Sequence, residues 1–313
     1  MTDFGADHSF MAATAKLKEH YGIAVPASAV RDITEDHGAT MLAVQKQESE
    51  LPEVAGVAVL ITEMDGSLVP TVETAAPAKA AEGIARIDRR KTRKLSWTEA
   101  RLCLAHQPGS VTPIFGATMG SVDDAGDRWW ECAIAAGAGR KTKLHGLGDG
   151  AVWITNQIDL KFGTQATYLV DFYHLCEYLS AAASAITAPA NKDAWMEEKK
   201  HWLKDNRSPD VLEALLPFLE AESIPDEKAP VRACHRYISN RTDFLDYKGA
   251  LAAGLPIGSG EIESAHRYVI QVRVKIAGAW WSTENLSKML ALRVVRVNGT
   301  WQHYWGDLDK KAA

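Results

Sequence analysis

The spacing of apolar and polar residues changes in character along this chain of 313 residues. Between residues 9 and 47, apolar side chains recur every three to four positions, which predicts two or three amphipathic helices. Beyond them, apolar runs bounded by turn residues predict five strands, at 54–61, 94–106, 111–119, 143–148 and 166–171. The chain is therefore expected to fold as an α/β protein.

The segments between these strands predict helices and turns. Helices are expected to begin at Arg128, Ala151 and Asp171. Residues 120–126 are expected to form a polar loop, and Asp65-Gly66 a turn at the end of the first strand. Three strands followed by alternating helices and strands is the element order of the ribonuclease H-like fold, which has a mixed sheet.

Residues 175–250 show no strand signal, which predicts a helical insertion between the fifth strand and a late helix. A chain of 313 residues predicts about two domains. The expected division is a helix-turn-helix region at 1–50, a ribonuclease H-like domain formed by 51–175 and 251–313, and the insertion at 176–250.

Composition limits the class of protein. Hydrophobic residues make up 46% of the chain, yet no run of 18 uncharged apolar residues occurs, so no membrane span is expected. The first residues lack a basic and apolar secretion signal, and the four cysteines lack the close pairing of structural zinc sites. We expect a cytoplasmic protein with reduced, buried thiols.

The N-terminal helices have the pattern of a helix-turn-helix. The first of them is expected to end at Gly22, and Ser28 is expected to cap the second. In such a motif Ser28, Ala29 and Arg31 would lie at the exposed start of the recognition helix and contact base edges. A small helical bundle is the alternative that this pattern leaves open.

Three acidic residues stand where α/β sheets bind ligands. Asp65 follows the first strand, and Asp149 lies between two glycines after the fourth. Glu263 falls in the first turn of a helix expected after the glycine-rich loop 254–260, with Ser259 as its cap. Together these carboxylates would offer oxygen ligands to two Mg²⁺ or Mn²⁺ ions for phosphoryl transfer. The structural alternative for Asp65 and Asp149 is turn formation, and the one for Glu263 is helix capping.

Two of these assignments have alternatives. Asp171 also ends a strand and competes with Asp149, while Glu261 competes with Glu263.

Basic residues are concentrated locally, although the net charge of −5 argues mildly against nucleic-acid binding. A solvated loop or a phosphate-binding patch would explain the run that includes Arg86, Arg89, Arg90, Lys91, Arg93 and Lys94. Basic residues that follow Glu263 could also contact phosphates, namely Arg267, Arg273 and Lys275.

Three blocks of sequence, at residues 148–154, 169–179 and 256–264, resemble the signature blocks of DDE transposases from bacterial insertion sequences. The tail, with Gly-Ala-Trp-Trp at 278–281 and residues 298–305, is similar as well. Among these proteins the chain most resembles the ISKra family, which is related to the Mutator-like superfamily. The resemblance covers about residues 10–305.

This resemblance implies a function. Asp65, Asp149 and Glu263 would be the three catalytic carboxylates, and Asp171 with His174 would match an accessory D/CxxH element. The activity would be metal-dependent cutting of the element's DNA ends and their joining to target DNA, in a homodimer or larger assembly because two ends must be paired. The alternatives are a ribonuclease H-like nuclease without strand joining and a non-catalytic helix-turn-helix protein that binds DNA.

Overall fold

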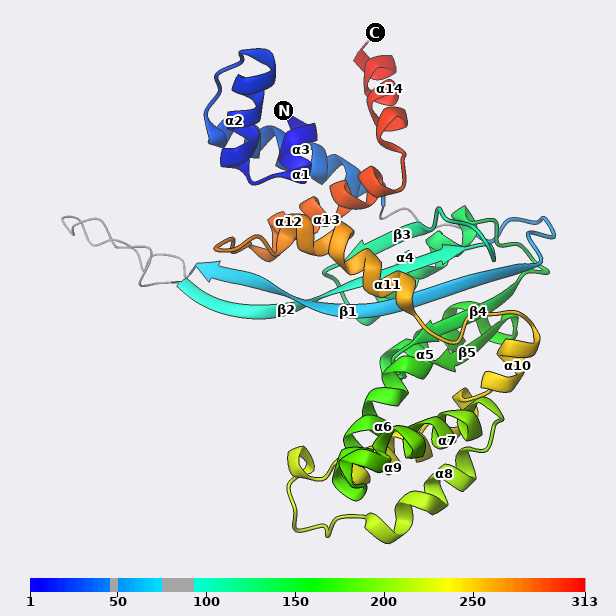
Figure 1. Ribbon diagram of the computed structural model, residues 1–313. Coiled ribbons are helices and arrows are strands. Elements are labelled where there is room, and N and C mark those ends of the chain that lie inside the picture. The colour runs from blue at the N-terminus through cyan, green and yellow to red at the C-terminus, as the bar shows by residue number, and fades with distance from the viewer. Residues whose placement is uncertain (46–49, 75–92, 313) are drawn as a thin grey trace, which may run out of the picture.

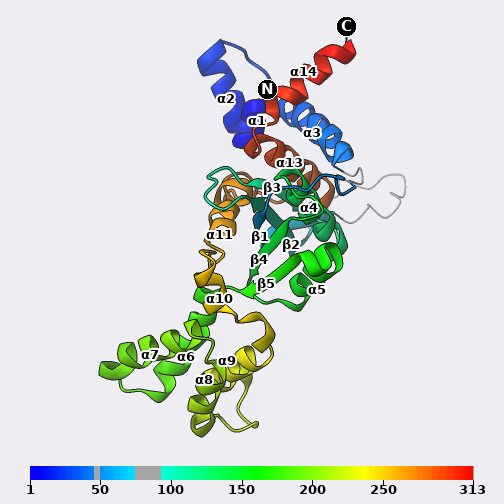
Figure 2. The same ribbon diagram turned by 90° about the vertical axis from the view of Figure 1, so that its right-hand side faces the viewer.

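A five-stranded mixed sheet lies at the centre of the computed structural model, which describes residues 1–45, 50–74 and 93–312 (Figure 1). Helices from both ends of the chain gather on one side of this sheet, and a long helical segment extends from the other side (Figures 1 and 2). The architecture is α/β, as the sequence predicts.

The strands follow the order β3-β2-β1-β4-β5 across the sheet. Their bounds are β1 Val59–Thr74, β2 Arg93–His106, β3 Ile114–Thr118, β4 Lys143–Gly148 and β5 Ala166–Val170. Strand β2 is antiparallel to β1 and β3, whereas β4 and β5 are parallel to β1 and to each other. This order and these directions are consistent with a ribonuclease H-like arrangement. Each of the five predicted strands has a counterpart, but β1 begins at Val59 and continues to Thr74, well past the end predicted at residue 61.

Two local predictions are wrong. Strand β1 runs without interruption through Asp65 and Gly66, both paired with β2, so no turn forms there. Helix α4, Val122–Ala135, begins within the segment predicted to be a loop. It begins there because Ser121 and Asp124 form a reciprocal capping box, which satisfies the free N–H groups of the first turn.

Each face of the sheet has its own helical cover. Helices α4 and α5 (Val152–Phe162) cover one face, which we call the α4/α5 face. The other, the α11 face, is covered over β1, β2 and β3 by a helical run and by α13, Thr283–Val297. The run consists of α11 (Gly260–Ala265), a π-helical segment (His266–Gln271) and α12 (Val272–Val274). Side chains alternate between the faces along a strand, so Glu63 and Asp65 share the α11 face.

The segment between β5 and α11 contains helices joined by loops, and no strand, over residues 172–252, as expected. Its helices are α6 Phe172–Ile186, α7 Lys192–Lys204, α8 Ser208–Leu215, α9 Pro230–Ser239 and α10 Tyr247–Ala252. They extend the hydrophobic core of the sheet outward, because buried residues of α6, α7, α8 and α9 join the same cluster as those of β4 and β5.

The N-terminal helices are α1 (Thr2–Asp7), α2 (Phe10–Tyr21) and α3 (Ala27–Val44). Helix α2 ends at Gly22, which adopts the left-handed conformation as expected. Helix α3 begins one residue before Ser28, so this serine lies in the first turn and the capping prediction is wrong.

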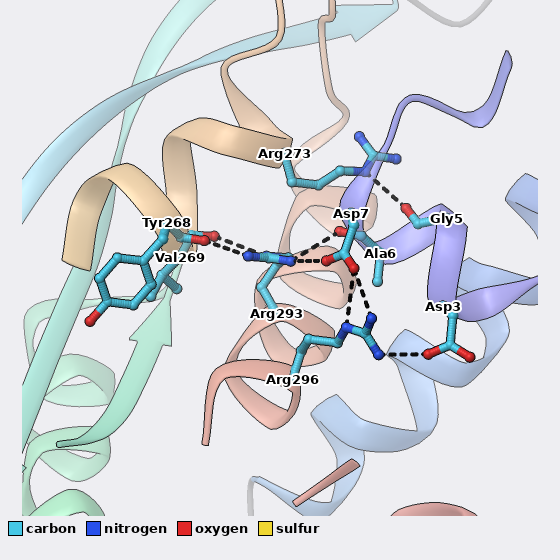
Figure 3. A network of polar contacts seen from close by, with 9 residues as sticks. All are labelled: Asp3, Gly5, Ala6, Asp7, Tyr268, Val269, Arg273, Arg293 and Arg296. Atoms are coloured by element: carbon cyan, nitrogen blue, oxygen red, sulfur yellow. Dashed lines mark hydrogen bonds and ion pairs between the residues drawn. The ribbon is translucent and has the colours of Figure 1, made fainter. Parts of the chain in front are cut away.

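Helix α3 packs closely against α13. Gly38 lies so near that a Cβ atom there would approach the carbonyl oxygen of Lys288 to 2.7 Å. Figure 3 shows a second connection, in which Arg293 and Arg296 of α13 both contact Asp7 of α1. The N-terminal helices and α13 are thus held together by both packing and ion pairs.

No helix within the described ranges is long and apolar enough to cross a membrane. All four cysteines are free thiols, and three of them, Cys103, Cys132 and Cys234, are buried.

Candidate active site at one edge of the sheet

Three of the predicted acidic residues lie at one level across the parallel strands. In the ladders, Glu63 pairs with Leu147, and Gly148 pairs with Val170. Asp149 and Asp171 are the residues directly after Gly148 and Val170, and Asp65 lies two positions after Glu63. All three therefore follow the paired residues at the same end of these parallel ladders.

Asp65 lies in the middle of the long strand β1. One carboxyl oxygen accepts a hydrogen bond of 2.7 Å from the Gly66 backbone N–H, and the other lies 3.0 Å from Nε2 of His266. His266 is 7% exposed and begins the π-helical segment. Such π-turns occur frequently at functional sites, because the extra residue changes where side chains point. Sequence analysis did not identify His266 as a site residue.

Asp149 follows β4 in a loop that other elements hold in place. Its carboxyl accepts a hydrogen bond of 2.8 Å from the Ala151 N–H and remains partly exposed. Gly150 has a φ of 78°, in the left-handed region that favours glycine. Because the side chain uses one hydrogen bond and is open to solvent, its remaining lone pairs are free to bind a cation.

Helix α9 and Arg241, two positions after its end, hold this loop from outside. The Tyr237 hydroxyl donates a hydrogen bond of 2.6 Å to the Asp149 carbonyl, and Nε of Arg241 donates one of 3.0 Å to the Gly150 carbonyl. Burial raises the pKa of Tyr237 well above its usual range, so the hydroxyl keeps its proton and remains a donor. The helical segment thereby positions an acidic residue of the sheet edge.

Asp171 has a different environment from Asp149. One carboxyl oxygen accepts the N–H groups of Tyr173 and His174 at the start of α6. The other accepts both the N–H and the hydroxyl of Ser259. The residue is 2% exposed. Four donors occupy about all the lone pairs of a carboxylate, so Asp171 joins α6 to the loop before α11.

Ser259 therefore does not cap α11 with its side chain, as sequence analysis expected, because its hydroxyl is bonded to Asp171. His174 is half-exposed, and its Nδ1 lies 3.5 Å from a carboxyl oxygen of Glu177. The structure thus gives Asp171 a joining role, while His174 stays at the surface of α6.

The first turn of α11 carries two acidic residues on either side of a buried one. Ile262 is 1% exposed and belongs to the core, whereas Glu261 and Glu263 are exposed. A carboxyl oxygen of Glu261 lies 3.0 Å from Nε2 of the buried His106. The burial of Ile262 therefore fixes the rotation of α11 and with it the direction of both glutamates.

Glu63 is an acidic residue that sequence analysis missed. It is 1% exposed, and its carboxyl accepts a hydrogen bond of 2.7 Å from the Ile262 N–H. Burial, opposed by the bond from Ile262 and assisted by the negative charges of Glu261, Asp171 and Glu263, raises its pKa to about 8. The signal in the sequence is an acidic residue two positions before Asp65, on the same face of the strand.

The donors at this edge are carboxylate oxygens, the ligand type that Mg²⁺ and Mn²⁺ prefer. Among the described residues, no three His, Cys, Asp or Glu side chains are grouped closely enough to hold a metal ion. The structure thus brings Asp171, Glu261 and Glu263 within electrostatic range of Glu63, while Asp65 and Asp149 follow the paired residues of β1 and β4. A shared coordination sphere would require the exposed side chains to turn inward.

The predicted DNA-contacting residues lie in several environments. Ser28 and Arg31 are exposed and Ala29 is half-buried at the start of α3, where Arg31 pairs with Asp32 at 2.7 Å. A helix-turn-helix geometry is not established for α2 and α3. Of the basic run, Arg86, Arg89, Arg90 and Lys91 lie outside the described residues.

The remaining basic residues differ in exposure. Arg93 and Lys94 are exposed at the start of β2, and Arg267 is exposed on the π-helical segment. Lys275 is partly buried and donates a hydrogen bond of 2.7 Å to the Ser67 hydroxyl. Arg273 is 2% exposed, which removes it from the outer surface where it was expected to meet phosphates.

Residues 6–311 match the sequence profile of an uncharacterised protein family, UPF0236, and the chain therefore belongs to that family. No curated protein matches the chain.

Proposed function

We propose that this member of the UPF0236 family is a DDE transposase of a bacterial insertion sequence, similar to those of the ISKra family. Its activity would be metal-dependent cleavage of the element's DNA ends and their transfer to target DNA. The observation that carries the proposal is the acidic edge of a sheet with ribonuclease H-like strand order. Asp65 and Asp149 follow the paired residues of β1 and β4 at this edge, and Glu263 lies in the first turn of α11.

In this proposal Asp65, Asp149 and Glu263 would hold two Mg²⁺ or Mn²⁺ ions. When bound, such ions lower the pKa of an attacking hydroxyl and stabilise the departing 3′-oxygen. The chain's own contribution is placement. The Ile262 N–H bonds to Glu63 and fixes α11 against β1, while Tyr237 fixes the loop of Asp149.

The contacts favour Asp149 over Asp171 as the second ligand. Asp171 already accepts four hydrogen bonds and is buried, so binding a cation would break the connection between α6 and the loop before α11. Asp149 makes one side-chain hydrogen bond and is partly exposed. Glu263 is favoured over Glu261 because Glu261 already contacts His106.

DNA would be bound through exposed basic residues, as phosphate contacts that weaken with salt. The described candidates are Arg31, Arg93, Lys94 and Arg267, all exposed. Pairing of two element ends would require a homodimer or a larger assembly.

The test uses purified full-length protein, duplexes carrying the terminal sequences of the element that encodes the chain, a target plasmid and Mg²⁺. Cleaved ends joined to the plasmid are expected. Asp65→Asn, Asp149→Asn and Glu263→Gln should each lower product formation at least about 1000-fold, because each removes a ligand on which charge stabilisation in the transition state depends. Circular dichroism should show that each variant is folded.

Other outcomes would decide against the proposal. Nicks without joined product would indicate a ribonuclease H-like nuclease, and specific DNA binding that is indifferent to Mg²⁺ would indicate a non-catalytic DNA-binding protein. Activity that survives in one of the three variants would refute the role of that residue.

A further inference from the structure

A cavity of about 280 Å³ lies away from the acidic edge, between the N-terminal helices and the segment that joins α12 to α13. Phe10 at the start of α2 and Arg31 and Glu35 of α3 line one side. Arg273 of α12 and the consecutive residues Trp280 and Trp281 line the other. The cavity therefore forms only where four segments distant in sequence meet.

Aromatic rings provide the walls. The rings of Phe10 and Trp281 meet edge to face, with centroids 6.4 Å apart. Trp281 is 6% exposed and its indole N–H donates to the Val274 carbonyl, so this ring is fixed. Trp280 also lines the cavity and is 40% exposed. A fixed ring beside an accessible one suits a flat, unsaturated ligand.

The polar side chains of the cavity include an unused donor. The guanidinium of Arg273 lies 4.7 Å from the Phe10 ring centroid and 4.8 Å from that of Trp281. Its Nε donates to the Gly5 carbonyl (Figure 3), but its Nη2 is buried without a hydrogen-bond partner in the described chain. Leaving a buried donor unpaired costs about 1–3 kcal/mol, more for a charged group. A ligand that supplies an acceptor would recover that cost.

Glu35 adds an acceptor beside this donor. Burial raises the pKa of Glu35, which nearby Arg31, Lys288 and Arg273 partly offset. Burial also lowers the pKa of Arg273 to about 10, which still leaves it a cation at neutral pH. The cavity thus combines a hydrogen-bond donor, an acceptor and aromatic walls.

We propose that this cavity binds a single unstacked base of the DNA on which the chain acts, a proposal that rests on the proposed function. Adenine, guanine and cytosine each carry an exocyclic amino group beside a ring nitrogen or carbonyl acceptor. The amino group would donate a hydrogen bond to the Glu35 carboxylate, and the acceptor atom of the base would accept one from the Arg273 guanidinium. The base would stack on the tryptophans. The volume of the cavity, about 280 Å³, is slightly below the roughly 300–1,000 Å³ of sites for drug-sized ligands. A volume of this size suits a single base.

The location of the cavity also fixes which base it would receive. Arg273 follows Glu263 by ten positions along one helical run, a span of about 15 Å at 1.5 Å per residue. Successive phosphates along one strand are about 3.4 Å apart along the helix axis. The bound base is therefore expected within about four nucleotides of the phosphate that is cut.

The experiment uses full-length protein and terminal duplexes with a single mismatch at each position near the cut. A mismatch lowers the cost of unpairing a base, so at one position within about four nucleotides of the cut it should tighten wild-type binding about 10-fold. Trp280→Ala and Glu35→Ala should remove this gain. Phe218→Ala, which changes an exposed aromatic of the helical segment (49% exposed), should keep it.

The outcomes of this experiment, together with a measurement of nucleotide binding, separate the alternatives. The absence of any such position, or an unchanged gain in Trp280→Ala, would overturn the assignment even if the protein cuts and joins matched duplexes. Tight binding of adenosine or guanosine 5′-monophosphate, without a mismatch effect, would assign the cavity to a free nucleotide and overturn the DNA proposal. Failure to bind any duplex would overturn both this inference and the proposed function.

Discussion

The two faces of the sheet differ in what holds them to their helices. The α4/α5 face is apolar, and its central side chain, Trp129, is fully buried among residues such as Met64 and Phe162. The α11 face is also apolar over β1, β2 and β3, but beside the ends of β4 and β5 it is held by carboxylates, with Glu63 bonded to Ile262 and Asp171 bonded to Ser259.

This difference shows how one sheet serves two purposes. Apolar contacts are non-directional and add stability in proportion to the area buried. Buried carboxylates are costly unless every lone pair is satisfied, but they fix backbone positions closely. The α11 face therefore gives up some stability in return for the defined placement of the acidic residues around it.

The largest expected effect on stability comes from the apolar face. Trp129→Ala removes a fully buried indole that packs edge to face on Phe162 and donates to the Thr62 hydroxyl. The free energy of unfolding should fall by about 4 kcal/mol, as for other large core truncations. Urea unfolding would measure it, with Trp97→Ala (60% exposed) as control. A loss below about 1 kcal/mol would contradict this view of the face.

The joining role of Asp171 predicts the next largest effect. In Asp171→Asn, one side-chain oxygen becomes an amide nitrogen that cannot accept the two donors of Ser259. The free energy of unfolding should fall by about 3 kcal/mol, because buried donors lose a charged acceptor. Asp149→Asn is the matched control and should lose at most about 1 kcal/mol of stability while losing DNA cleavage. The reverse pattern would make Asp171 the catalytic residue.

The buried Glu63 predicts a dependence of stability on pH. Its pKa of about 8 in the folded protein exceeds the ordinary value of 4.5, so the folded state binds the proton more tightly. The resulting stabilisation is complete below pH 4.5 and is lost as the pH rises toward 8. Between pH 5 and pH 7 the free energy of unfolding should fall by about 2–3 kcal/mol more in wild type than in Glu63→Gln. If urea titrations show that the free energy of unfolding falls equally with pH in wild type and in Glu63→Gln, this prediction is refuted.

The smallest effect is expected at the contact between the helical segment and the sheet edge. Tyr237→Phe removes the hydrogen bond to the Asp149 carbonyl and should cost about 1 kcal/mol of stability. Because the loop of Asp149 would then be less well placed, DNA cleavage should slow about five-fold at saturating DNA. Tyr173→Phe, at an exposed tyrosine, is the control and should change neither. Unchanged cleavage in Tyr237→Phe would show that α9 does not position this loop.

Much of the fold could be predicted from the sequence because its signals are local. Apolar runs bounded by glycine and proline placed all five strands, and the order of strands and helices indicated the arrangement of the sheet. The start of α4 was missed although Ser121 and Asp124 carry its capping box. The turn at Asp65-Gly66 was mistaken because pairing with β2 extends β1 through a dipeptide that favours turns when isolated.

The candidate site was less predictable. Residue type and position at strand ends selected Asp65, Asp149 and Asp171 together, and nothing local could rank them. Glu63 was missed because the strand was expected to end before it, and Arg273 was assigned to the surface because basic residues usually lie there.

The sequence by itself determined the order of the elements and the set of acidic residues available to one edge of the sheet, because periodicity and turn chemistry act over a few residues. The tertiary structure alone decided which of those residues is saturated by hydrogen bonds and which stays open. Asp171 and its partner Ser259 are 88 positions apart, and Glu63 and Ile262 are 199 apart. The burial and hydrogen bonding of a carboxylate depend on such distant partners, and those exist only once the chain has folded.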